Sequence, residues 1–241
     1  MPPSAALKSF AIFLSALCYF INSTPPLPPP KSNANVYTGN FFERFMRPIG
    51  VVTRTLTCTM FVVSFFFEVI RLLPTTVQAE LPRGICASQS RDDGMPSVNS
   101  IFVAGCIACI VGAAARKWCY TTLGDLFTFE VTLKPCVDST DILITSGPYA
   151  FVRHPSYIAA AANHLGVATM LLADGGWIRK CEVTSTPFGT VVLVWLGLLA
   201  WTVWSLMRRI KVEDRNLKMR FGRTWEQYAQ KVPYKVIPGL Y

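Results

Sequence analysis

A turn near the middle of the chain, GPYAFVRHPSY (147–157), places charged and aromatic groups directly before an apolar run. Pro155 suits the first position of a helix, and the residue before a proline avoids helical backbone, so His154 is expected at the N-cap. The free N–H groups of such a helix start favour an anion. The rings of Tyr149 and Tyr157 flank the turn and can hold a cation such as a sulfonium. The turn therefore has the residues of a binding site for a charged ligand.

The same turn also has a purely structural interpretation. Arg153 at the edge of a membrane segment can extend its charge to water, and tyrosines gather at membrane interfaces. A proline can simply begin the helix. By themselves, these residues leave both interpretations open.

A second group with chemical potential lies in the basic C-terminal region. Arg209 and Glu213 stand four residues apart, on one face of a helix that continues the last apolar run. Gly222 is expected to end this helix, and TWEQ (224–227) has the form of a capping box that starts another. The Arg209 face is predicted to lie beside the membrane, on the same side as His154, which favours a functional role.

Apolar runs dominate the chain and predict a membrane protein. Hydrophobic residues make up 51% of the 241 residues and charged residues 15%, whereas soluble domains carry about a quarter charged residues. A membrane span needs about 20 residues. Five runs stand out, at 9–21, 55–73, 98–115, 156–173 and 187–207. We therefore predict an all-α, polytopic membrane helical bundle with about five transmembrane helices.

The first run has two interpretations. Lys8 followed by apolar residues 9–21 resembles the hydrophobic region of a signal peptide. The bulky sequence CYFINSTPP that follows offers no convincing small-residue cleavage site. A short span or a signal anchor is therefore favoured, followed by a stiff proline-rich linker at 25–30.

Charge predicts the orientation of the bundle. The tail from 208 to 241 holds nine Lys or Arg against three acids, which places it in the cytosol. Two predicted membrane spans separate the segment 116–155 from the tail, so this segment faces the same side as the tail. The loops 74–97 and 174–186 then face the lumen. Cys86 and Cys181 then share the oxidising side, where a disulfide between them is permitted. The net charge of +9 does not indicate nucleic-acid binding, because the basic residues flank apolar runs.

Three features inside the runs have structural interpretations. Cys106 and Cys109 form a C-x-x-C without partner ligands, which indicates packing and not a metal site. Ala104, Ala108 and Gly112 are spaced four apart and predict a small-residue face for close helix packing. Glu68 is placed to meet Arg71 one helical turn later.

One polar pair within a run could have a functional role. His164 stands next to Asn163 inside a predicted span and could line a lipid tunnel. The more common role of such a pair is to satisfy a neighbouring helix, and this interpretation is favoured.

Three segments together resemble the isoprenylcysteine carboxyl methyltransferase family. They are LFTFEV (126–131), ILITSGPYAFVRHPSY (142–157) and RIKVEDRNLKMRFGRTWEQYAQKVPYKVIP (209–238), within the C-terminal half of the chain. The resemblance implies a bundle whose cytosolic helical tail forms a pocket for S-adenosyl-L-methionine. It also implies an enzyme of the endoplasmic reticulum membrane whose partner is the prenylated C-terminal cysteine of CaaX proteins, with no metal and no nucleic acid.

The resemblance also assigns expected roles to individual residues. The cofactor-binding residues that it implies are Leu143, Ile144, Tyr149, Arg153, His154, Pro155, Ser156, Tyr157 and Glu213. Arg209 is implied as the catalytic residue that binds the substrate carboxylate. The chain then divides into an N-terminal part (1–40), a transmembrane part (41–125) and a catalytic part (126–241).

The chain departs from the family pattern at several positions. Asp141 stands in place of a common histidine, Ile144 in place of a valine, and Thr132 in place of a glutamine. Ala159 replaces a glycine, and Asp214 replaces a second glutamate, which is a mild change. These departures bear on substrate preference more than on cofactor binding.

The chemistry that the resemblance implies needs no general base. A C-terminal carboxylate has a reference pKa of about 3.5 and is already ionised at neutral pH. Alignment and desolvation can therefore carry the reaction. The alternatives are a phospholipid or small-molecule membrane methyltransferase, an NADPH-dependent sterol reductase-like protein and a non-catalytic membrane scaffold.

Overall fold

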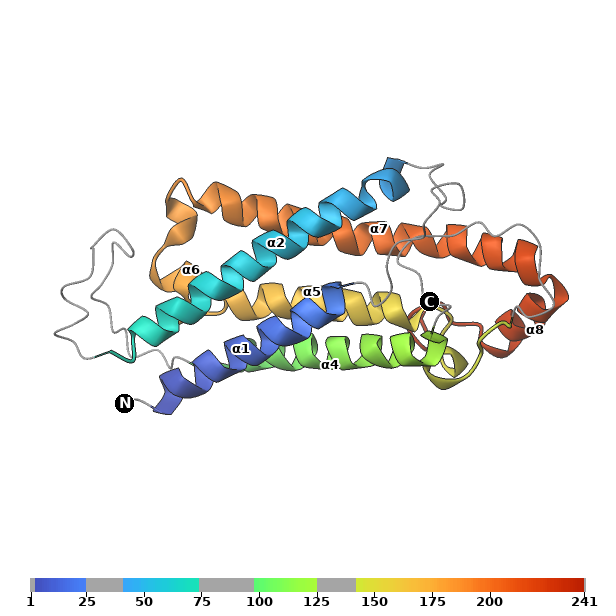
Figure 1. The fold of residues 1–241 in the computed structure, drawn as a ribbon, viewed down its shortest axis with the longest axis horizontal. Coiled ribbons are helices and arrows are strands. Elements are labelled where there is room, and N and C mark those ends of the chain that lie inside the picture. Colours follow the sequence, from blue (N-terminus) through green and yellow to red (C-terminus); the bar gives the residue numbers. More distant parts are fainter. Residues whose placement is uncertain (1–2, 25–40, 74–97, 125–141, 241) are drawn as a thin grey trace.

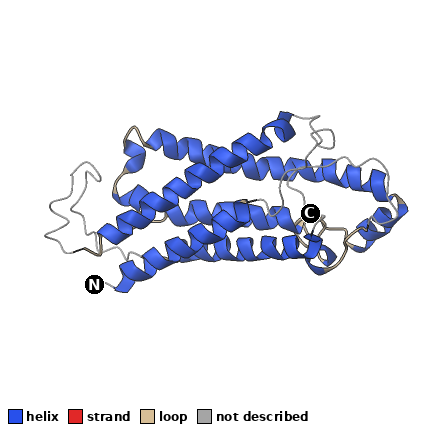
Figure 2. Cartoon of the chain, viewed as in Figure 1, coloured by secondary structure: helices blue, strands red, loops and turns tan. Residues whose placement is uncertain are grey.

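The computed structural model describes residues 3–24, 41–73, 98–124 and 142–240, and all regular structure in these ranges is helical (Figures 1 and 2). The long helices are α1 (Pro3–Ser23), α2 (Phe41–Ile70), α4 (Ser100–Leu123), α5 (Pro155–Leu172) and α7 (Gly189–Phe221). Each is long and apolar enough to cross a membrane. The prediction of an all-α bundle with about five spans is thus confirmed for this part of the chain. The proline-rich stretch, Cys86, Cys136, Thr132 and Asp141 lie outside the described residues.

The helices run along one another and give the bundle two ends (Figure 1). The short helix α6 (Trp177–Lys180) and the 3-10 turn η5 (Val183–Ser185) join α5 to α7 at one end, called here the α6 end. The helix α8 (Arg223–Lys231) lies at the other, called the α8 end. The predicted spans at 156–173 and 187–207 are therefore joined through the short connection 174–186 into a helical hairpin. The last span and the basic tail form one continuous helix, α7, which projects past the ends of α4 and α5 toward α8 (Figure 1).

The closest helix contact joins α4 and α5 through glycines. A Cβ atom added at Gly105 would lie 2.5 Å from the backbone nitrogen of Met170, and one at Gly166 would lie 2.4 Å from that of Cys109. At Gly112, a Cβ would lie 2.6 Å from the carbonyl oxygen of Ala159. Small residues let the two backbones approach in this way.

The predicted small-residue face is confirmed at Gly112 and wrong at Ala104. Gly112 and the backbone of Ala108 approach α5, whereas Ala104 is exposed and the buried residues of this face are Gly105, Cys109 and Gly112. Neighbouring residues on a helix are turned by about 100°, so four-residue spacing alone identified only part of the face that packs. Cys106 and Cys109 are free, buried cysteines within the hydrophobic core.

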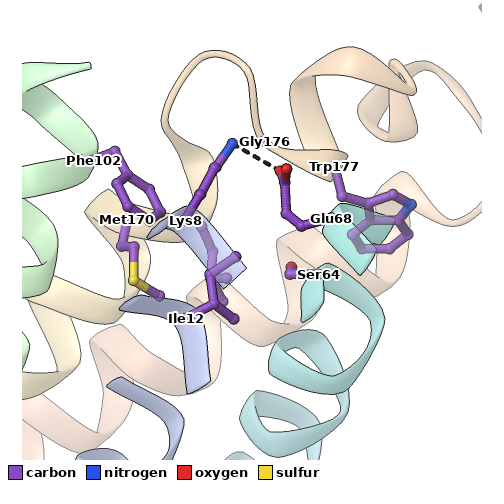
Figure 3. A pocket seen from close by; sticks show the side chains of 9 residues that line it. Lys8, Ile12, Ser64, Glu68, Phe102, Met170, Gly176 and Trp177 are labelled. Atoms are coloured by element: carbon purple, nitrogen blue, oxygen red, sulfur yellow. Dashed lines mark ion pairs between the residues drawn. The ribbon is translucent and has the colours of Figure 1, made fainter. Parts of the chain in front are cut away.

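The helix α1 is held in the bundle by a buried ion pair near the α6 end (Figure 3). The Lys8 ammonium lies 2.9 Å from Glu68 Oε1 and donates to the carbonyl oxygen of Gly175 at 2.7 Å. Glu68 Oε2 also accepts from Arg71 at 3.3 Å, which confirms the predicted contact. Lys8 and Glu68 are each 1% exposed. Because a buried charge is costly without its partner, this pairing makes α1 an integral helix of the bundle, as the span interpretation predicted.

Polar residues in the middle of the bundle satisfy one another across helices. Asn163 of α5 accepts from Asn22 Nδ2 of α1 at 2.7 Å and donates to the carbonyl oxygen of Cys109 of α4 at 2.7 Å. His164 Nδ1 lies 2.8 Å from the carbonyl oxygen of Ala160 in its own helix. The favoured interpretation, that the pair satisfies neighbouring helices, is confirmed for Asn163, whereas the hydrogen bond of His164 stays within α5.

Candidate functional site

The turn that the sequence singled out folds as predicted at the α8 end. The 3-10 helix η4 (Gly147–Ala150) begins at Gly147, whose φ of 61° is a conformation that glycine adopts without a steric penalty. The helix α5 starts at Pro155, and His154 is its N-cap residue with φ of −126° and ψ of 58°, outside the helical region. Its side chain makes no capping hydrogen bond and is therefore directed to other partners.

Those partners are two adjacent carboxylates on α7. Nε2 of His154 lies 2.9 Å from Asp214 Oδ1, and Nδ1 lies 3.4 Å from Glu213 Oε2. The imidazole thus lies between both acids of the tail helix. This contact fixes the α5 N-terminus against the part of α7 that projects from the bundle.

The flanking residues of the turn strengthen the same junction. Tyr157, in the first turn of α5, donates from its hydroxyl to Glu213 Oε2. Its ring stacks on that of His154 with centroids 5.5 Å apart and an interplanar angle of 13°. Arg153 Nη2 lies 3.6 Å from Asp214 Oδ2, and its guanidinium lies 5.5 Å from the ring centroid of Trp225. The pair Arg153–His154 therefore meets the pair Glu213–Asp214.

The end of the chain folds back over this junction. The backbone N–H groups of Arg153 and His154 donate to the carbonyl oxygens of Tyr234 and Lys235, at 3.0 Å and 2.7 Å. Tyr228 of α8 donates from its hydroxyl to the carbonyl oxygen of Tyr149 at 2.8 Å. These bonds satisfy backbone groups of the turn that no helix satisfies, and they bring the tail onto the site.

The cluster holds His154 in its charged form. Burial disfavours the imidazolium, but the hydrogen bonds and negative charges of Asp214 and Glu213 outweigh it and raise the pKa of His154 to about 9. Burial raises the pKa of the Tyr149 hydroxyl far above its usual range, so this group stays neutral. At neutral pH, a cationic imidazolium therefore bridges two carboxylates.

Arg209 lies on the inward side of α7, one helical turn before Glu213. Its side chain is 6% exposed, and its positive charge acts on the Glu213 carboxylate. The prediction that Arg209 and Glu213 share a face of one helix near His154 is confirmed. The role of Arg209 toward a ligand stays a prediction.

The remaining predicted residues lie around this cluster at different depths. Pro155 and Ser156 are buried in the first turn of α5. Leu143 and Ile144 are half-buried in the segment that leads into η4, and their described contacts do not include the charged cluster. Among the residues that the structure describes, no group of three His, Cys, Asp or Glu is arranged to hold a metal ion.

Several residues of the site were not expected from the sequence. Asp214 is a mild replacement in the family pattern, yet it makes the shortest contact with the His154 side chain. A buried arginine of α4, Arg116, donates from Nη1 to the carbonyl oxygen of Ser156 at 3.3 Å and supports the start of α5. Trp225 and Tyr228 reach the turn from α8. In the sequence, Asp214 directly follows Glu213, just as His154 directly follows Arg153. Two adjacent acids that match two adjacent basic residues are the sequence feature that could have indicated this contact.

The boundary between α7 and α8 corrects one prediction. Gly222 ends α7 as expected, with φ of 51°. The helix α8 begins at Arg223 with Gly222 as its N-cap and no side-chain cap, so Thr224 is inside the helix. The TWEQ capping box is therefore wrong, because the glycine turn starts the next helix one residue earlier.

Known proteins are similar to this chain over a region that includes much of the candidate site. Residues 103–219 match the family model described as "Isoprenylcysteine carboxyl methyltransferase (ICMT) family". A probable protein-S-isoprenylcysteine O-methyltransferase of Oryza sativa subsp. indica is 33% identical over 128 residues, which are 53% of this chain and 56% of that protein. The protein-S-isoprenylcysteine O-methyltransferase of Schizosaccharomyces pombe is 32% identical over 123 residues, 51% of this chain and 44% of that protein.

A second class of protein shares a shorter part of the chain. A delta(14)-sterol reductase of Mus musculus is 31% identical over 99 residues, which are 41% of this chain and 20% of the reductase. The chain spans about half the length of the curated methyltransferases that it matches. The match to the reductase covers a much smaller fraction of that protein.

Proposed function

Because residues 103–219 match the model of the isoprenylcysteine carboxyl methyltransferase family, we propose that this protein transfers a methyl group from S-adenosyl-L-methionine to the C-terminal carboxylate of a prenylated cysteine. One observation carries the proposal. His154 and Tyr157 at the start of α5 bind the carboxylates of α7, one helical turn from the buried Arg209. Cationic, anionic and aromatic groups therefore converge where the membrane helices end.

The residues of the junction fit the proposed cofactor. S-adenosyl-L-methionine carries a sulfonium and an ammonium as well as hydroxyl groups, and it needs carboxylate and aromatic partners. Glu213 remains 37% exposed beside His154 and keeps oxygen lone pairs accessible to such groups. The Tyr157 ring offers an aromatic face to a cation. The residues that would hold the cofactor are Leu143, Ile144, Tyr149, Arg153, His154, Pro155, Ser156, Tyr157 and Glu213.

Arg209 is proposed to orient the substrate carboxylate. When bound, the cofactor supplies an activated methyl group, and an ionised carboxylate attacks it without a general base. The guanidinium can bind both carboxylate oxygens and fix their direction. Its low exposure of 6% strengthens this attraction, because charges interact more strongly away from water.

The location at the α8 end suits a substrate with a lipid chain. Arg209 directly follows the apolar part of α7, so a prenyl group can remain in the bilayer while its carboxylate reaches the guanidinium. The basic tail supports a cytosolic position for this end, and the family resemblance supports the endoplasmic reticulum membrane. Prenylated CaaX proteins are accordingly the proposed partners.

Two measurements on the purified full chain in detergent test the proposal. Calorimetry should detect binding of S-adenosyl-L-methionine but not of NADPH. Labelled methyl groups should then be transferred to an S-farnesyl-cysteine derivative and not to phosphatidylethanolamine. Binding of NADPH without binding of S-adenosyl-L-methionine would favour the reductase alternative and contradict the proposal.

A further inference from the structure

The part of α7 that leaves the bundle has two opposite faces. The inward face carries Arg209 and Glu213 of the candidate site. The outward face carries four exposed cations, which we call the basic stripe: Arg208, Lys211, Arg215 and Lys218. Of these, Lys218 forms an ion pair with Glu226. At about 100° per residue, the stripe lies within an arc of about 80°, roughly opposite Arg209.

The basic stripe continues a face of α7 that is turned to lipid. Leu193, Gly197, Ala200 and Trp204 precede it within the same arc, and all four are exposed in the bundle. Leu193 is 67% exposed, as expected of a side chain that faces acyl chains. One face of the helix is therefore apolar up to Trp204 and basic from Arg208 onward. A protein partner would not need this continuity, whereas a bilayer presents acyl chains and headgroups in this order.

Two tryptophans mark where the headgroups begin. Trp204 of α7 is 46% exposed, and Trp118 near the C-terminal end of α4 is 53% exposed. Trp118 lies in the last two turns of α4, whose C-terminus is at the α8 end (Figure 1), and Trp204 lies about one helical turn before Arg208 on α7. Exposed tryptophans concentrate at the membrane interface. Arg208 lies over the Trp204 ring at 5.1 Å, so the first cation of the stripe is already at this level.

The rise of the helix sets the height of the other cations. Lys211 stands about 4–5 Å beyond Arg208 and Arg215 about 10 Å beyond it. The headgroup layer is about 5–8 Å thick on each side, and surface charge acts over about 8 Å at physiological salt. Lys211 is thus level with the headgroups and Arg215 within their field. Lys218 already pairs with Glu226 at 3.0 Å.

We propose that the basic stripe binds the anionic headgroups of phospholipids in the leaflet at the α8 end. The two acids of α7, Glu213 and Asp214, are engaged with His154 and do not neutralise the stripe. The bound headgroups fix the height and tilt of the α7 extension, and with it the level of the Arg209 face above the bilayer. Binding of lipid to the basic stripe does not require that the protein transfers methyl groups.

A matched pair of variants tests the stripe. K211Q/R215Q removes two charges from the stripe, and R223Q/K231Q removes two exposed charges from the region of α8. Native mass spectrometry of each purified full chain would count bound phosphatidylserine against phosphatidylcholine, with both lipids present in equal amounts. Neither double variant touches a residue of the candidate site.

The wild type and R223Q/K231Q should retain phosphatidylserine preferentially, and the preference should fall as salt is raised. In K211Q/R215Q, the ratio of bound phosphatidylserine to bound phosphatidylcholine should fall about fivefold for each charge removed. Equal retention of the two lipids by the wild type would overturn the proposal, as would equal losses in the two double variants. Stripe-dependent binding of a polyglutamate peptide without lipid preference would identify an acidic protein as the occupant and also contradict it.

Discussion

Nε2 of His154 lies 2.9 Å from Oδ1 of Asp214, although the two residues are 60 positions apart in the sequence. The contact joins the N-cap of α5 to the projecting part of α7. Glu213 and Tyr157 contact the same imidazole, and Arg153 contacts the same aspartate.

Asp214→Asn is expected to weaken binding of S-adenosyl-L-methionine by about tenfold to a hundredfold. The amide keeps the shape of the side chain but removes the charge that holds His154 and Arg153, and a hydrogen bond to a charged group contributes about 1.5–3 kcal/mol. Calorimetry with the purified variant measures the affinity. Glu226→Gln is the control, because Glu226 pairs only with the exposed Lys218 in the described contacts and should leave the affinity unchanged. Full affinity in Asp214→Asn would remove the His154–Asp214 contact from cofactor binding.

Arg209→Ala is expected to lower methyl transfer at least tenfold while cofactor binding survives. The loss follows from removing a charge-assisted hydrogen bond to the carboxylate. Arg209→Lys should restore little activity, since an ammonium cannot form the two parallel bonds of a guanidinium. Turnover with an S-farnesyl-cysteine derivative, measured beside cofactor affinity, separates the two effects. Near-normal turnover in the alanine variant would show that Arg209 does not act on the substrate.

The stability of the protein should fall as pH rises toward 9, and His154 should be responsible. Its pKa is about 9 in the folded protein, above the value of about 6.5 for an unperturbed histidine. A raised folded pKa gives stability that is fully present below pH 6.5 and is lost as the pH passes through 9. The effect is of the order of a few kcal/mol at most.

Thermal unfolding in detergent between pH 6 and 9.5 measures this loss. The wild type should lose stability over this interval, and His154→Gln should show a flatter curve from a lower starting value. Parallel curves for the two proteins would show that another group titrates in this interval.

Gly166→Ala is expected to destabilise the bundle by about 1–3 kcal/mol through overpacking. The new methyl group would lie 2.4 Å from the backbone nitrogen of Cys109, so α4 and α5 would have to separate. Gly197→Ala is the matched control, because no atom lies within 4 Å of a Cβ atom there. Thermal unfolding of both variants in the same detergent gives the comparison. Equal stability of the two would contradict the close contact of α4 with α5.

Cys181 is disulfide-bonded, and the five other described cysteines are free. The remaining two, Cys86 and Cys136, lie outside the described residues. Since the charge pattern places Cys86 and Cys181 on the same, oxidising side, we predict that they are the bonded pair. Peptide mapping without reduction should yield a linked Cys86–Cys181 peptide.

The same bond reports on the orientation of the chain. In sealed microsomes, a membrane-impermeant maleimide should miss both thiols after reduction by a permeant reagent and reach them once detergent is added. Labelling of Cys181 without detergent would place the α6 end in the cytosol and reverse the proposed orientation.

The sequence by itself determined the number and the approximate limits of the membrane helices. The reason is local, because a run of about 20 apolar residues has few alternatives to a helix in a bilayer. Proline and glycine likewise marked the start of α5 at Pro155 and the end of α7 at Gly222, since both act through their own backbone geometry. The motifs around RHPSY also indicated the resemblance to the isoprenylcysteine carboxyl methyltransferase family, because each is a continuous stretch of sequence.

Only the tertiary structure decided which residues meet. The packing face of α4 is Gly105–Cys109–Gly112 and not the face through Ala104, because the choice depends on the surface of α5. Lys8 is buried beside Glu68, a pairing between two helices that no local pattern contains. The role of Asp214 depends in the same way on where α7 passes α5. Long-range partners are set by how helices pack, and spacing along one helix cannot reveal them.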